Sequence, residues 1–404
     1  MRNFSLIRDE ADPVKPRASD VLGLGRLAVQ ATLGVTDVVE GMHHAVVRAP
    51  RLFGAPAPGR TRGITGLVYR GVRGVTRLVG GGTDAVLARL VTSVGDARES
   101  SPRREALLAA LNGVVGDHLA ASGNPLAIPM RLRRDGRPLE LDARALAGAI
   151  PRPGGKILLL VHGLCLNELQ WTRQGHDHGA ALAAEHGWTP LYLHYNTGLH
   201  VSTNGRALAG LIEALLRCWP APVEELAIVG HSMGGLVSRS ACHYGAALGH
   251  AWPRRLRRLV FLGTPHHGAP LERGGNVVDA VLGRGRYTAS LARLGKVRSA
   301  GITDLRHGNL LDEDWTGRDR FARGGDGRAP VPLPPGVACH AIAATTGRRM
   351  GDVRDRVLGD GLVPLWSALG PVPAERQWIG YELGHLDLLH RREVYEKLRE
   401  WLAG

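Results

Sequence analysis

The most regular feature of the chain is an alternation of short apolar runs with longer amphipathic segments, from about residue 130 to the C-terminus. Apolar runs with the length and continuous hydrophobicity of buried strands lie at 156–163, 189–195, 225–230, 256–263, 339–347 and 375–380. Segments of helical length separate or follow them, at 175–187, at 207–219, after 230 and at 392–404. This order predicts a mainly parallel sheet with helices on both faces.

Two segments of this region do not follow the alternation. Residues 130–141 consist of two short strands around Asp135-Gly136, a pair that favours a hairpin turn. The interval from about 269 to 336 is rich in Gly, Arg and Pro. We predict that residues 270–335 form a lid or cap, because they follow directly on the strand that ends at 263.

Residues 1–125 have helical periodicity, many glycines and no strand pattern, which predicts a helical extension ahead of an α/β domain at 126–404. An internal repeat with an offset of forty residues relates 23–47 to 63–87. In each copy the apolar positions share one helical face, and the second copy also carries arginines. We expect these helices either to pack as a cap on the rest of the protein or to lie in an anionic membrane interface.

Composition narrows the class of protein. The formal net charge is +14, but the arginines are spread along the chain and no nucleic-acid-binding motif is present, so we expect no nucleic-acid partner. The cysteines at 165, 218, 242 and 339 have no metal-binding spacing, which argues against a disulfide scaffold or zinc module. The first residues contain no apolar signal segment, and no apolar run approaches the roughly 18 residues of a spanning helix. We predict a cytoplasmic protein, with peripheral membrane contact through the N-terminal helices as the alternative.

The stretch 225–245 carries the clearest chemical signal. An apolar strand runs into Gly-His-Ser-Met-Gly at 230–234, and a helix follows. A serine on such a strand–turn–helix is held in a strained conformation at the carboxyl edge of the sheet, and small neighbours such as Gly230 and Gly234 relieve the crowding. The pattern predicts that Ser232 is a nucleophile.

A serine nucleophile needs a base and an acid that orients the base, and on this type of sheet they follow in the order serine, acid, histidine. Asp360 lies in a Gly-flanked turn after the strand at 339–347, and His385 lies between the last strand and the final helix. Three other carboxylates compete with Asp360 for the acid's role, at Asp352, Asp355 and Asp387. We predict a triad of Ser232, Asp360 and His385.

The triad also needs donors for the developing oxyanion. The strand at 156–163 ends in His162-Gly163, so the next backbone N–H, that of Leu164, is expected to point into the site. The second donor is the N–H of Met233, directly after the nucleophile. Four further histidines are expected to pack in the turns or to border the substrate: His162, His231, His266 and His267. The chemistry requires neither a metal nor an organic cofactor.

Five motifs carry a resemblance to a known family: "HGL", "GHSMGGLVSR", "LGTPHHGAPLE", "GDGLVP" and "GHLDLL". With them, the chain from about 130 to 404 resembles α/β-hydrolases of the lipase/esterase kind, in particular bacterial triacylglycerol lipases and the PGAP1-like group. The resemblance implies the α/β-hydrolase fold. It also implies catalytic roles for Ser232, Asp360 and His385, and oxyanion donors at Leu164 and Met233.

These observations predict a serine hydrolase that cleaves carboxylic esters with apolar acyl groups through an acyl-enzyme. The expected substrate is a lipid or another ester. Two alternatives stay open. The same fold could transfer the acyl group to an alcohol instead of water, or it could serve as a non-catalytic lipid- or protein-binding module.

Overall fold

The computed structural model describes residues 17, 19–31, 33, 101–269, 298–319, 326–348 and 359–403. The chain divides into two compact units, one formed by Met1–Arg104 with Ala121–Leu126 and the other by Glu105–Ala120 with Ala127–Gly404. The sequence assigned all of residues 1–125 to the helical extension, whereas the contacts group 105–120 with the second unit. Most of the repeat at 23–47 and 63–87 lies outside the described residues.

In the first unit, residues 19–31 are helical and are attached to the segments around residues 104 and 124. The buried guanidinium of Arg104 donates to both carboxylate oxygens of Asp20, from Nε over 2.6 Å and from Nη2 over 2.5 Å. Asn124 donates from Nδ2 to the carbonyl oxygen of Gly23 over 3.0 Å. These hydrogen bonds join residues 19–31 to the segments around residues 104 and 124 in the described part of the first unit.

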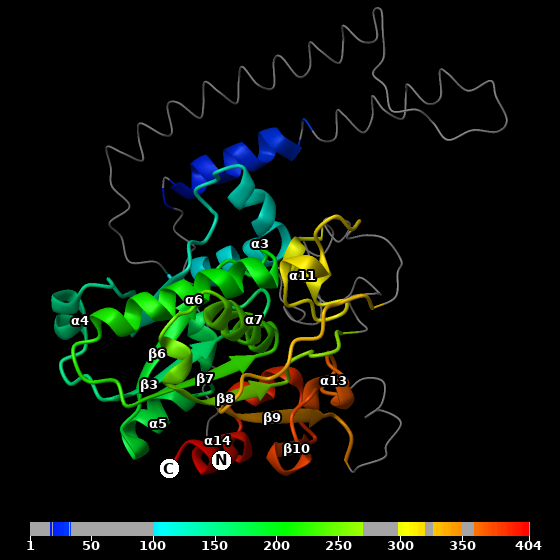
Figure 1. The fold of residues 1–404 in the computed structure, drawn as a ribbon. Helices are drawn as coiled ribbons and strands as arrows, with labels where there is room; N and C mark the ends of the chain where they lie inside the picture. The colour runs from blue at the N-terminus through cyan, green and yellow to red at the C-terminus, as the bar shows by residue number, and fades with distance from the viewer. Residues whose placement is uncertain are drawn as a thin grey trace, which may run out of the picture. The chain divides into compact units, whose positions relative to one another are not determined.

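The second unit is built on an eight-stranded sheet with the order β10-β9-β8-β7-β3-β6-β1-β2 (Figure 1). The strands are β1 (Arg131–Arg134), β2 (Arg137–Pro138), β3 (Lys156–Val161), β6 (Thr189–His194), β7 (Glu225–His231), β8 (Leu256–Leu262), β9 (Ala338–Thr345) and β10 (Gln377–Tyr381). All neighbours from β10 to β6 pair in parallel, and β1 pairs antiparallel with β6 and β2. A separate hairpin pairs β4 (Thr172–Arg173) with β5 (His176–Asp177). The predicted parallel sheet and the hairpin at Asp135-Gly136 are confirmed.

Helices cover both faces of this sheet. On one face α6 (Val201–Cys218) packs against α7 (Met233–Ala247), and on the other α5 (His178–His186) packs against α14 (Arg392–Leu402) (Figure 1). The described residues from 101 onward also form the helices α3 (Pro102–Ala121), α4 (Ala143–Ala149), α11 (Ala300–Asp304), α13 (Leu365–Leu369), η1 (Glu168–Trp171), η2 (Trp252–Arg254), η3 (Asp312–Asp314), η4 (Ala374–Arg376) and η5 (His385–Leu389). None of the helices within the described residues is long and apolar enough to cross a membrane.

The core lies along the central strands. All of Ile157–Val161 in β3 is fully buried, as is most of β7 and β8, because parallel strands in the middle of the sheet have helices on both faces. This explains why their sequences are continuous apolar runs rather than alternating ones.

The predicted lid at 270–335 lies partly outside the described residues. Its described part includes α11, where the buried carboxylate of Asp304 accepts hydrogen bonds from the backbone N–H of Val201 over 2.8 Å and from Nδ1 of His200 over 3.0 Å. This part is therefore fastened to the start of α6. Its role as a lid stays a prediction.

Candidate active site

The turn at Ser232 joins β7 directly to α7. Ser232 has φ 54° and ψ −126°, a left-handed φ that is strained for any residue with a side chain. A Cβ atom on Gly234 would meet the carbonyl oxygen of Val161 and would lie 2.6 Å from that of His162. A Cβ on Gly230 would lie 2.6 Å from the Cα of Gly235. The glycines predicted from the sequence are therefore required by backbone packing around the strained serine.

A buried histidine–carboxylate pair lies after β9 and β10. Nδ1 of His385 lies 2.7 Å from Oδ2 of Asp360, and both side chains are buried. The other oxygen of Asp360 accepts from the backbone N–H groups of Leu362 over 3.0 Å and Val363 over 2.8 Å. Because a carboxylate accepts, Nδ1 of His385 is the donor, which leaves Nε2 as the ring's lone-pair nitrogen. Asp387, the nearby rival, instead accepts from the backbone N–H of Gly384 over 2.8 Å and caps η5.

The ends of β3, β7 and β8 bring these groups to the same edge of the sheet. A Cβ on Gly163, after β3, would lie 2.9 Å from the Cβ of Ser232. A Cβ on Gly263, after β8, would lie 3.1 Å from Oδ2 of Asp360 and 3.2 Å from Cε1 of His385. The ring of His231, adjacent to Ser232 in sequence, has its centroid 4.7 Å from that of His385. Ser232 therefore lies close to Gly163, and the Asp360–His385 pair lies close to Gly263, at the same edge of the sheet.

The predicted oxyanion donors belong to Met233, directly after Ser232, and to Leu164, directly after Gly163. Met233 is the first residue of α7, so its N–H has no partner inside the helix. Leu164 follows Gly163 and is buried. The next residue, Cys165, has a left-handed φ of 60°, and its N–H donates to Oγ1 of Thr197 over 3.1 Å. This segment is the β3–η1 loop (residues 162–167), and it passes beside Ser232 at Gly163.

His162 and His231 are buried and face the backbone of the turns. Nδ1 of His162 donates to the carbonyl oxygen of Gly163 over 3.0 Å. The ring of His162 stacks on that of Tyr195, with 4.5 Å between the ring centroids. Burial lowers the pKa of His162 to about 4 and the pKa of His231 well below its usual value. Both rings are therefore neutral at pH 7.

The two histidines after β8 occupy different surroundings. His266 is buried, accepts at Nδ1 from Nη1 of Arg239 over 3.1 Å and packs edge-on against Phe261. Burial, followed by the charge of Arg239, lowers the pKa of His266 well below its usual value. His267 is exposed and stacks on Trp366, with 5.6 Å between ring centroids and an interplanar angle of 17°. A role of either residue in substrate binding stays a prediction.

A buried polar cluster that was not predicted from the sequence lies at the end of the β3–η1 loop. Among the described residues, one group has metal-ligand spacing: Glu105, Glu168 and His194, whose ligand atoms lie within 4.8 Å of one another. Arg133 donates from Nη1 to Glu168 over 2.6 Å and to Glu105 over 3.0 Å. Burial alone would raise the pKa of Glu168, but hydrogen bonds and charge from His194 and Arg133 lower it to about 2. With a guanidinium between the carboxylates, the cluster is an ion-pair network rather than a cation site.

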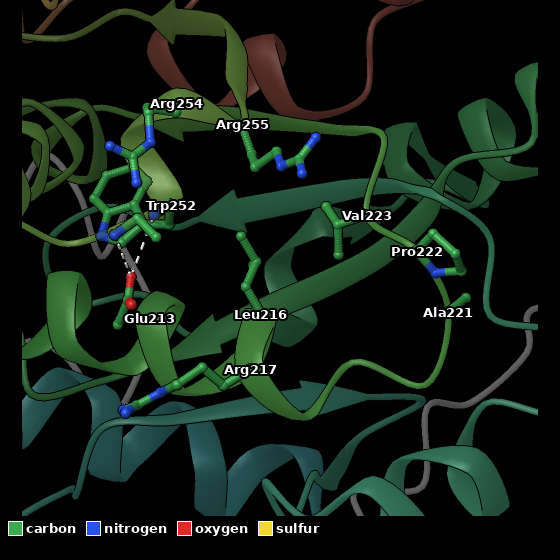
Figure 2. Close-up of a pocket in the computed structure, with 10 residues that line it drawn as sticks. Glu213, Leu216, Arg217, Ala221, Pro222, Val223, Trp252, Arg254 and Arg255 are labelled. Atoms are coloured by element: carbon green, nitrogen blue, oxygen red, sulfur yellow. Dashed lines mark hydrogen bonds between the residues drawn. The ribbon is translucent and has the colours of Figure 1, made fainter.

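A pocket of about 590 Å³ lies at the opposite edge of the sheet (Figure 2). It is formed by the end of α6, the residues before β7, and η2 before β8. Glu213 spans part of it by accepting hydrogen bonds from the N–H groups of Ala251 over 2.9 Å and Trp252 over 3.2 Å. None of the predicted site residues lines this pocket.

Comparison with known proteins agrees with this description. Residues 152–328 match the family of PGAP1-like alpha/beta domains. No curated protein matches the chain in sequence. Together with the parallel sheet and the turn at Ser232, the family match confirms the predicted α/β-hydrolase fold.

Solved structures similar to the chain include lipases and esterases. A Bacillus licheniformis lipase in its propeptide form is 18% identical with a TM-score of 0.44, covering 63% of this chain and 52% of that one. Aspergillus fumigatus lipase B is 12% identical with a TM-score of 0.37, covering 63% and 55%. A lipase-esterase related protein of Clostridium acetobutylicum is 13% identical with a TM-score of 0.35, covering 61% and 94%. The chain thus spans about half the length of the two lipases.

Proposed function

Residues 152–328 are a PGAP1-like alpha/beta domain, and we propose that the protein is a serine hydrolase that cleaves carboxylic esters with an apolar acyl group. One observation carries the proposal. Ser232 occupies a strained left-handed turn at the carboxyl edge of the sheet, and its neighbour His231 hydrogen-bonds the backbone of His385, whose ring is joined to Asp360 over 2.7 Å. Strain of this kind costs on the order of 1–3 kcal/mol and is found where a side chain must be presented for chemistry.

In the proposed reaction, Oγ of Ser232 attacks the ester carbonyl carbon while Nε2 of His385 takes the hydroxyl proton. The tetrahedral intermediate collapses when His385 returns that proton to the leaving alcohol, which produces an acyl-enzyme. Water then attacks the acyl-enzyme with the same base, and Ser232 is regenerated. Asp360 stays ionised throughout and holds the ring of His385 in the tautomer that leaves Nε2 free to accept.

The oxyanion that forms at each step would be stabilised by the N–H groups of Leu164 and Met233. The start of α7 adds the positive end of a helix dipole at the same place. The other buried groups near the site favour neutral surroundings, since burial lowers the pKa values of both His162 and His231. The ring of His231, whose centroid lies 4.7 Å from that of His385, is therefore a neutral neighbour of the proposed base at pH 7.

The test is hydrolysis of p-nitrophenyl esters from acetyl to palmitoyl, together with labelling by a fluorophosphonate. We expect hydrolysis by the wild-type protein and a single label on Ser232. Ser232→Ala should lose the label and at least about a thousandfold in kcat, because the oxyanion donors alone sustain only a small residual rate. A wild-type protein that neither hydrolyses these esters nor takes the label would overturn the proposal in favour of a binding module.

A further inference from the structure

The β3–η1 loop carries the proposed oxyanion donor and must be held in position from outside, because its own conformation is strained. Gly163 brings the loop within van der Waals contact of Ser232. Two residues later, Cys165 has a left-handed φ of 60° although it is not a glycine. A residue in this conformation persists only where its surroundings fix it.

Two contacts hold the middle of the loop. The N–H of Cys165 donates to Oγ1 of Thr197 over 3.1 Å. On its other side Cys165 packs against Gly113 of α3, where a Cβ atom would lie 3.0 Å from the Cα of Cys165 and would overlap its sulfur. These contacts restrain the loop at Cys165, but they do not fix the position of its C-terminal end.

The end of the loop is fixed by Glu168, the first residue of η1. One carboxylate oxygen accepts from Nη1 of Arg133 over 2.6 Å, and the other lies 2.7 Å from Nδ1 of His194. Arg133 also donates to Glu105 of α3 over 3.0 Å. A single side chain therefore attaches the loop to β1 and β6, and through Arg133 to α3.

Stability alone does not account for this arrangement. A buried ion-pair network gains little over apolar packing of similar volume, because desolvation offsets most of the attraction. What the network adds is a defined position. Two short hydrogen bonds to residues on two different strands hold the carboxylate of Glu168 in one place. Oxyanion donors need a defined position, because they are effective only when they lie about 3 Å from the developing charge.

We propose that Glu168 is a positioning residue for the oxyanion site, and that its bonds to Arg133 and His194 set the place of the Leu164 N–H relative to Ser232. The inference rests on the proposed function, because it assigns a role within the same reaction. It predicts that loss of the Glu168 bonds weakens binding of the transition state and leaves binding of the ester largely unchanged.

The experiment compares Glu168→Gln with Glu225→Gln in the full chain. Glu225 forms an ion pair with Arg258 at the opposite edge of the same sheet, so it controls for loss of a charged pair. We expect Glu168→Gln to lower kcat on a p-nitrophenyl ester by roughly 10- to 100-fold with KM within about twofold. Affinity for a trifluoromethyl ketone inhibitor, which mimics the tetrahedral adduct, should fall by the same factor. Glu225→Gln should change none of these.

A second pair of variants keeps the test independent of folding. In His194→Asn the amide can replace the Nδ1 donor, so activity should remain within a few-fold of wild type, whereas His194→Leu should repeat the loss seen with Glu168→Gln. Unchanged kcat in both Glu168→Gln and His194→Leu, or a KM effect in place of a kcat effect, would overturn the assignment. If the wild-type protein takes no fluorophosphonate label and hydrolyses no ester, the failure lies instead with the proposed function.

Discussion

Nε2 of His231 donates a hydrogen bond to the backbone carbonyl oxygen of His385, with 3.1 Å between the two atoms. The carbonyl can only accept, so the proton of the neutral His231 ring resides on Nε2. This side chain is adjacent to Ser232 in sequence, and it supports the segment that carries the proposed base. The strand that leads to the proposed nucleophile and the segment that carries the proposed base are thus joined through one buried ring.

We predict that His231→Leu impairs catalysis and stability together. The change leaves a buried carbonyl of His385 without its donor, which costs about 1–3 kcal/mol, and it frees the η5 segment to shift. His231→Gln retains an N–H donor at similar reach and should recover most of both losses. Chemical denaturation and kcat on a p-nitrophenyl ester measure the two effects. Equal kcat in His231→Leu and wild type would show that the support is not needed.

The proposed acid, Asp360, can be distinguished by mutation from the alternative carboxylate, Asp387. Asp360 contacts the ring of His385, whereas Asp387 accepts from the N–H of Gly384 and caps η5. Asp360→Asn should lower kcat by about 10⁴-fold, since the amide favours the wrong tautomer of His385. Asp387→Asn should cost less than about tenfold, because an asparagine oxygen can still cap the helix. Steady-state kinetics of the two variants decide, and the opposite ranking would identify Asp387 as the acid.

The turn at Ser232 gives a prediction for stability. Gly234→Ala would drive a methyl group into the carbonyl oxygens of Val161 and His162, so the variant should lose at least about 2–3 kcal/mol of unfolding free energy or fail to fold. Gly210, in α6, has open space around its Cα. Gly210→Ala should therefore stabilise the protein by about 0.5–1 kcal/mol through helix propensity. Urea denaturation measures the unfolding free energy of both variants. If the two variants are equally stable, Gly234 is not crowded by the carbonyl oxygens of Val161 and His162.

The sequence was most informative where local chemistry and the global fold agree. The buried strands are continuous apolar runs, and the Gly-x-Ser-x-Gly turn follows one of them directly, so the sheet and the serine could be predicted without coordinates. The start of α6 could not be predicted in this way. The helix begins at Val201, before the predicted 207, and its first turns bury Asn204 and Gly205. A Cβ on Gly205 would overlap Ser240 of α7, so a close helix contact replaces the apolar stripe that periodicity looks for.

The polar cluster at Glu168 was missed for a different reason. Its four members come from α3, β1, η1 and β6, and each alone is an ordinary charged or polar residue in the sequence. Buried ion pairs between distant segments leave no periodicity. The only local indication was that Glu168 directly follows the β3–η1 loop. Its partners could not be predicted without knowing that β1 and β6 lie beside that loop.

Buried neutral histidines make stability depend on pH. Burial lowers the pKa values of His162 and His178 to about 4. As the pH falls below about 6.5, the unfolded chain binds protons that the folded protein does not, so stability present above 6.5 is lost as the pH approaches 4. Each such histidine contributes a slope of about 1 kcal/mol per pH unit within this window.

We therefore expect the free energy of unfolding to fall steadily between pH 6.5 and 4, and His178→Gln to reduce that slope by about 1 kcal/mol per pH unit. His178 donates from Nε2 to the carbonyl oxygen of Leu388 over 3.1 Å, a bond that glutamine can approximate. His118→Gln serves as the control, because that side chain is exposed. Urea titrations at several pH values measure the slopes. An unchanged slope in His178→Gln would mean that His178 is protonated in the folded protein.

The hydrolase unit, which is the second of the two compact units, begins within α3. Residues 105–120 of α3 contact loops at the carboxyl edge of the sheet: the carbonyl oxygen of Gly113 accepts from Oγ of Ser299 over 2.6 Å, and that of Gly116 accepts from Nδ2 of Asn196 over 2.8 Å. Asp117 accepts from the N–H of Ala300 over 3.0 Å. A chain that starts at residue 101 keeps all three bonds, and one that starts at residue 122 keeps none.

We expect the shorter chain to lose at least about 3 kcal/mol, roughly 1 kcal/mol for each bond, in addition to the apolar surface that α3 covers. It should also lose esterase activity, because Gly113 no longer supports Cys165 beside the proposed oxyanion donor. The chain that starts at residue 101 should retain kcat within a few-fold of the full-length protein. Thermal denaturation and ester hydrolysis of the two truncated proteins make the comparison. Equal stability and activity in both would place α3 outside the hydrolase unit, as the sequence had suggested.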